Sequence, residues 1–164
     1  LRDGVLEGEY APALLIKDTL SLGVHVFNHF LLSLSSNISS GKAQSRGLVV
    51  VAFACPPCFY VDLLRASDCY SDPKDKLRDV GDAEKLSSLV FDLGRGLVGP
   101  GKGRFSVAID SASELLRHTS LLSVSSLINN LRSHDQVASL FWLHSDLHEP
   151  RAILSLEYLS SMVA

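Results

Sequence analysis

The feature that most limits the fold is an uninterrupted apolar stretch, Gly47–Ala54, which reads Gly-Leu-Val-Val-Val-Ala-Phe-Ala. It is rich in β-branched residues and shows no alternation of apolar and polar positions, so a strand here would be buried on both faces. Strands of that kind lie inside parallel sheets that helices cover on both sides. We therefore expect a central parallel strand and an α/β fold.

The rest of the chain alternates between short apolar runs and helical periodicity. Further strands are expected at Ala13–Asp18, Phe105–Ser111 and Val137–His144. Six helices are expected: from Leu20, over Pro57–Leu64, around Leu86–Leu93, after Asp110 through Leu116, over Leu121–Leu131, and from Pro150. The third of these helices should end in a glycine-rich turn at Gly94–Gly103. The last helix should extend far enough for Val163 to face inward. Because parallel neighbours need helical crossovers, this alternation predicts a doubly wound domain with a mainly parallel sheet.

Length and composition favour one domain. A chain of 164 residues that is 46% hydrophobic can build one core but is too short for two ordinary domains. We expect residues 1–164 to form that single domain as a fragment of a longer chain, with an exposed loop at about 67–82, where charged residues surround Pro73. A net charge of -3 argues against a broadly basic nucleic-acid binder.

Two further observations concern location. Cys55, Cys58 and Cys69 are an odd number of cysteines, which fits a reducing compartment better than a disulfide-stapled secreted domain. No apolar run reaches the roughly 18 to 20 residues of a membrane helix. We expect a protein of the cytoplasm or nucleus with no membrane partner.

The strand at Phe105–Ser111 carries the clearest chemical pattern, because it ends in Asp110 and Ser111. A strand that ends in an acidic residue is where P-loop ATPases hold the magnesium ion of a nucleotide. This pattern is typical of the Walker B strand of RecA-type ATPases. A functional site would also need a phosphate-binding loop.

The sequence offers no convincing phosphate-binding loop. Gly96–Gly103 satisfies G-x-x-x-x-G-K but has glycine where Ser or Thr should bind magnesium, and a helix is expected before it and a strand after it. After the first strand, Lys17–Gly23 retains one glycine and no Gly-Lys pair. We expect a RecA-like fold without a functional P-loop, with no bound cofactor and no ATP turnover.

The rival pattern is Cys55-Pro56-Pro57-Cys58, a C-x-x-C after a buried strand and before a helix, as in thioredoxin-type redox sites. Pro100 lies at a plausible distance for the proline that faces such a site. Against this reading, roughly sixty residues with two helical stripes and a strand follow Pro100, more than a thioredoxin domain contains. Structural cysteines are the preferred interpretation, and a thiol-disulfide oxidoreductase or a metal site with Cys69 are the alternatives.

Histidines form two local pairs. His25 and His29 lie one helical turn apart, without the glutamate of H-E-x-x-H and without a third ligand, so we expect a solvated or partner-facing side and no metal site. His144 and His148 follow the end of a strand, where α/β folds place their sites. We expect a structural or interface role there, with Asp146 able to cap the helix that begins at Pro150.

Several stretches, in order over nearly the whole chain, are together similar to one family. They are Leu1–Gly4, Ala11–Leu14, Arg46–Phe53, Val107–Ser111 with Leu115–Leu116, Leu143–His148 and Leu156–Leu159. The Leu-His-Ser-Asp-Leu-His stretch carries most weight, because strands ending in Ile-Asp-Ser are widespread among RecA-like proteins. On these residues the chain resembles the fifth subunit of the Elongator complex, in its plant-like version.

The resemblance implies a RecA-like, non-catalytic subunit that lacks a working Walker A motif. Such a subunit assembles with the fourth and sixth subunits into a ring of two copies each. The ring is an accessory part of the machine that modifies wobble uridines in transfer RNA, while the catalytic chemistry resides in another subunit.

On this reading, Asp110 could cap the following helix and Ser111 could bond nearby backbone, both as structure. Lys102 and Arg104, before the same strand, are the candidates for a contact with RNA or a neighbouring subunit.

Overall fold

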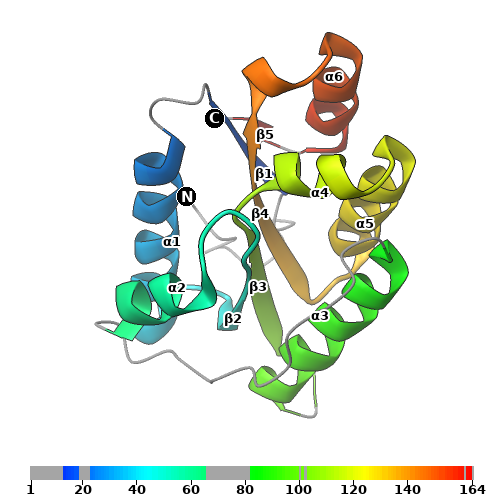
Figure 1. Ribbon diagram of the computed structural model, residues 1–164. Coiled ribbons are helices and arrows are strands. Elements are labelled where there is room, and N and C mark those ends of the chain that lie inside the picture. The colour runs from blue at the N-terminus through cyan, green and yellow to red at the C-terminus, as the bar shows by residue number, and fades with distance from the viewer. Residues whose placement is uncertain are drawn as a thin grey trace.

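A computed structural model describes residues 13–18, 23–65, 82–99, 101, 103–160 and 162–163. These residues contain a five-stranded sheet in the order β2-β3-β4-β1-β5, in which every pair of neighbours is parallel (Figure 1). The strands are β1 (Leu14–Asp18), β2 (Ser45–Val51), β3 (Arg104–Ile109), β4 (Val137–His144) and β5 (Met162–Val163). The predicted α/β class with a parallel sheet is confirmed.

Helices cover both faces of this sheet. They are α1 (Gly23–Ser39), α2 (Pro57–Leu64), α3 (Ala83–Val98), α4 (Ala112–His118), α5 (Leu121–Ser133) and α6 (Pro150–Leu159), with a 3-10 helix at Ser145–Leu147. The connection from β1 to β2 crosses the sheet in one direction, whereas the connections from β2 to β3, from β3 to β4 and from β4 to β5 run in the other. Since such crossovers are right-handed, α1 lies on one face and α3 to α6 lie on the other (Figure 1). The short helix α2 also belongs to the connection from β2 to β3, but it packs on the face of α1.

Alternate residues of β1, β2, β3 and β4 pack into two separate cores. On the face of α1 and α2, Ile16 packs with Phe27 and Trp142, whose rings stack with centroids 5.8 Å apart. On the other face, Leu15 and Phe105 pack against the inner sides of α3, α5 and α6. The predicted inward stripe of α5 is buried, at Val124, Leu127, Ile128 and Leu131.

The prediction that Gly47–Ala54 forms a central strand was wrong. β2 begins at Ser45, ends at Val51 and pairs only with β3 among the described residues. Helices still pack on both of its faces, α1 on one and α3 on the other, although Leu48, Val50 and Val51 are only partly buried. Helices can cover both faces of a strand at the end of a sheet as well as in its middle.

Other boundaries also differ from expectation. Gly94 and Gly96 lie inside α3, which continues to Val98, and Val163 lies in β5 because α6 ends at Leu159. The expected context of Gly96–Gly103 between a helix and a strand is confirmed, although the helix overlaps it: α3 ends at Val98, within this stretch, and β3 begins at Arg104. The expected loop at 67–82 and the position of Cys69 lie outside the described residues, apart from Asp82, which caps α3.

The two glycines of α3 provide a matched test of this packing. A Cβ at Gly94 would overlap the ring of Phe105, which is fully buried, whereas a Cβ at Gly96 meets no atom within 4 Å. We expect Gly94→Ala to cost about 1–3 kcal/mol of unfolding free energy through overpacking. Gly96→Ala should gain up to about 1 kcal/mol through helix propensity. Urea denaturation of both variants measures this, and equal effects would contradict the packing described.

Candidate functional site

The carboxyl ends of the strands gather chemically interesting residues at one edge of the sheet. Because the strands are parallel, β1, β2, β3 and β4 all end at this edge, where open α/β sheets place their ligand sites. Asp110 follows β3 there, His144 closes β4, and Cys55 follows β2. The predicted acidic end of the third strand is therefore in the expected place.

The Asp110 carboxyl group is fully buried and accepts hydrogen bonds at both oxygens. Its Oδ1 accepts from the amide of Phe53 at 2.6 Å, and its Oδ2 accepts from the amides of Ala54 at 3.0 Å and Cys55 at 3.1 Å. The Tyr60 hydroxyl of α2 donates to the same Oδ2 at 3.0 Å. Three successive amides around one anionic group form a backbone nest, here filled by a side chain of the same chain.

Electrostatics at this cluster favour an acceptor carboxylate and a donor phenol. Burial raises the pKa of the Asp110 carboxyl, and the three amides and Tyr60 oppose that shift. A group that accepts at both oxygens has the hydrogen-bonding pattern of an ionised carboxylate. Burial, then the charge of Asp110, raises the pKa of the Tyr60 hydroxyl above its usual range, so the hydroxyl keeps its proton and donates it.

The structure corrects the role that sequence reasoning gave Asp110. Asp110 does not cap the following helix: Ser111 is the cap of α4, and its Oγ accepts from the amide of Glu114 at 3.1 Å. The prediction that Ser111 bonds nearby backbone is confirmed. Asp110 instead binds a segment more than fifty residues earlier, and its own amide donates to the Val51 carbonyl at 3.1 Å.

These contacts limit what Asp110 can do for a metal ion. A magnesium ligand, direct or through water, needs a carboxylate oxygen that faces the ion, whereas the Asp110 carboxyl is fully buried and accepts one protein hydrogen bond at Oδ1 and three at Oδ2. Among the described residues, no three His, Cys, Asp or Glu side chains are grouped so that they could hold a metal.

The C-x-x-C sequence lies beside this cluster. Cys55 is partly buried and Cys58 is exposed, and both thiols are free. Pro57 is the first residue of α2, as predicted, but Pro56 before it is extended, with φ -63° and ψ 145°. Cys55 therefore lies before the helix, and Cys58 lies in its first turn.

The second cluster of this edge lies at the ends of β4 and β1. The His144 amide donates to Ser113 Oγ at 3.0 Å, and Ser145 Oγ donates to the Asp18 carbonyl at 3.1 Å. The His144 ring meets Trp142 edge-on, with centroids 4.5 Å apart. Asp146 is not the cap of α6, because Glu149 occupies that position and makes no side-chain capping bond.

Of the two residues proposed for an RNA or subunit contact, Arg104 lies at the opposite end of the strands. Arg104 begins β3, six residues before Asp110, so about 20 Å of strand separates them. Its guanidinium donates to the Asp135 carbonyl at 3.1 Å and to the side chain of Gln44, which joins three chain segments. Lys102 lies outside the described residues. His25 and His29 are both exposed on α1, as expected.

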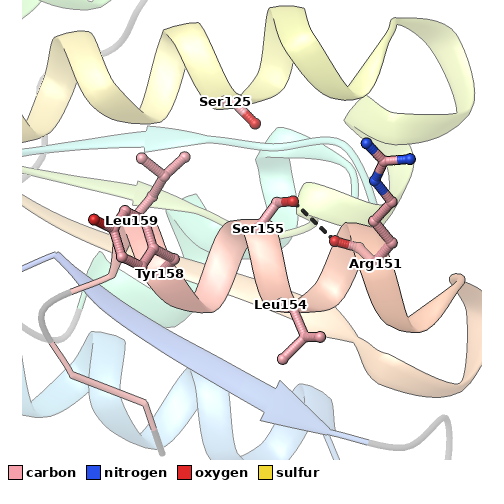
Figure 2. A pocket seen from close by; sticks show the side chains of 6 residues that line it. All are labelled: Ser125, Arg151, Leu154, Ser155, Tyr158 and Leu159. Atoms are coloured by element: carbon pink, nitrogen blue, oxygen red, sulfur yellow. Dashed lines mark hydrogen bonds between the residues drawn. The ribbon is translucent and has the colours of Figure 1, made fainter.

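A shallow surface pocket between α5 and α6 was not predicted from the sequence (Figure 2). Ser125, Arg151, Leu154, Ser155, Tyr158 and Leu159 line it. Tyr158 is 86% exposed and Leu154 is 63% exposed, so both lie off the inward stripe of α6. The sequence could have indicated this pocket, because Leu154 and Tyr158 are one helical turn apart and form a second apolar stripe on this helix.

Comparisons with known proteins add no assignment: no protein-family model matches this chain, and no curated protein matches it. In the parts of the chain that the structure describes, no helix is both long and apolar enough to cross a membrane.

The Asp110 cluster generates a stability prediction. Asp110→Ala leaves three amides and one hydroxyl without their acceptor, so the unfolding free energy should fall by about 3 kcal/mol or more in urea denaturation. Tyr60→Phe removes a single donor and should cost about 1 kcal/mol.

Added formate provides the control, because this small carboxylate can enter the emptied nest. It should restore part of the stability of Asp110→Ala and leave Tyr60→Phe unchanged. An Asp110→Ala protein within about 0.5 kcal/mol of the original chain would show that the cluster does not hold the fold.

Proposed function

We propose that this chain is a non-catalytic RecA-like subunit of the Elongator type, which acts by assembling with two related subunits into a ring. The observation that carries the proposal is the engagement of Asp110 by four protein donors. The residue that would serve magnesium in an ATPase here ties β2, β3 and α2 together. Because this carboxylate stabilises the fold, it supports a structural and not a catalytic role for the carboxyl ends of the strands.

The distribution of the family-like stretches supports the same proposal. Arg46–Phe53 forms β2 and the loop after it, Val107–Ser111 forms the end of β3, and Leu143–His148 forms the end of β4. Stretches that are far apart in sequence thus meet at one edge of the sheet. The residues on which the resemblance rests are therefore concentrated where Asp110 and His144 make their hydrogen bonds.

In the proposed assembly, the chain would sit with the fourth and sixth Elongator subunits and, through the ring, support modification of wobble uridines in transfer RNA in the cytoplasm and nucleus. Chemistry would reside in another subunit. A loop contact with RNA or a neighbour by Lys102 and Arg104 remains a prediction. For Arg104 it would compete with the bonds to Asp135 and Gln44.

Co-expression with the two ring subunits tests this proposal. We expect one particle that contains all three chains in equal numbers, two copies each, by light scattering and native mass spectrometry. The Gly96→Ala variant, which alters only an exposed helix position, should assemble equally well. Recovery of this chain as a free monomer beside a complete complex of the other two would contradict the proposal.

A thiol-disulfide oxidoreductase is the second candidate, favoured by the two free thiols at the start of α2 on the carboxyl edge. The elements after residue 100 weigh against it, because β3, α4, α5, β4 and α6 are more than a thioredoxin domain contains there. In an insulin reduction assay with dithiothreitol, we expect the chain and its Cys55→Ser and Cys58→Ser variants to give the same background rate. A rate that either substitution abolishes would establish redox chemistry instead.

A further inference from the structure

The segment 144–149, between β4 and α6, holds two imidazole rings at the carboxyl edge. Nδ1 of His144 and Nε2 of His148 are both buried, and neither has a hydrogen-bond partner among the described residues. Buried polar atoms are nearly always paired, so leaving two of them unpaired costs the packed arrangement free energy. The packed arrangement of these two rings is therefore held by less free energy than a fully hydrogen-bonded one would be.

Hydrogen bonds hold the start of this segment more firmly than the rest of it. Its start is held by the bond from the His144 amide to Ser113 and by the bond from Ser145 to the Asp18 carbonyl. The 3-10 helix that follows lies against β1, and Leu147 on it is 44% exposed. The segment therefore covers the ends of β1 and β4 while part of its own apolar surface faces solvent.

Charges on several elements face His148. His144 at the end of β4 and Arg117 on α4 oppose a proton on this ring, and Asp146 on the 3-10 helix favours one. Glu114 of α4 pairs with Arg117 at 2.9 Å, and Asp18 of β1 is aligned with His144 in the sheet. Burial, followed by His144 and Arg117, lowers the pKa of His148.

We propose that residues 144–149 are a pH-sensitive latch over the ends of β1 and β4, closed while His148 is neutral and released when His148 takes up a proton. In the closed form an added proton would be partly removed from water and would face Arg117. Opening returns the ring to solvent, where its pKa has the ordinary value of about 6.5. The closed form is thus stable above about pH 6.5 and loses stability as the pH falls below it.

Hydrogen exchange of the intact chain tests the latch. For peptides that cover 145–149, the opening equilibrium, corrected for the intrinsic pH dependence of exchange, should rise by as much as about tenfold between pH 7.5 and 5.5. His148→Gln, which cannot titrate, should show no such rise. His25→Gln alters an exposed histidine of α1 and should respond like the unmodified chain. An unmodified chain without the rise, or a rise that persists in His148→Gln, would overturn the proposal.

A second measurement needs no variant. In an NMR titration, the His148 ring should protonate below pH 6.5, and the amides of 145–149 should shift with the same midpoint. A ring that titrates while those amides stay unchanged would equally overturn the latch.

Discussion

The buried carboxyl group of Asp110 is the contact on which the carboxyl edge of this domain depends. Through it, the end of β3 holds the backbone that follows β2, and the Tyr60 hydroxyl adds the start of α2 to the same point. The bond from the Asp110 amide to the Val51 carbonyl continues the pairing of β2 and β3 up to this residue. The end of β2 and the direction of α2 therefore follow from one side chain.

The hydrogen bonds of Asp110 also bear on which functions this end of the sheet can have. A strand that ends in aspartate suggests nucleotide chemistry, but the donors around Asp110 belong to the protein itself, and the nest they form is filled. The neighbouring thiols lie at the start of α2, but β3, α4, α5, β4 and α6 follow, which is more than a thioredoxin domain contains there. The histidines across the edge are packed with unpaired ring nitrogens, which suits a movable segment better than a rigid centre.

Sequence patterns predicted the features that depend on neighbouring residues and missed those that depend on distant ones. Asp110 was placed at a strand end because an apolar run precedes it, yet its partners at Phe53 to Cys55 lie more than fifty residues away and leave no local signal. The apolar run of β2 predicted helices on both faces of the strand but not its place in the sheet, and Leu48, Val50 and Val51 are only partly buried there. Arg104 was expected just before a strand and is instead the first residue of β3, and its bonds to Gln44 and Asp135 join segments that only the fold brings together.

The central claim is that Asp110 serves the fold and not a nucleotide. Calorimetric titration of the purified chain with magnesium and ATP, beside the Asp110→Asn variant, tests it most directly. The account predicts no saturable heat for either protein. Saturable binding by the unmodified chain that requires magnesium and disappears in a folded Asp110→Asn variant would contradict it.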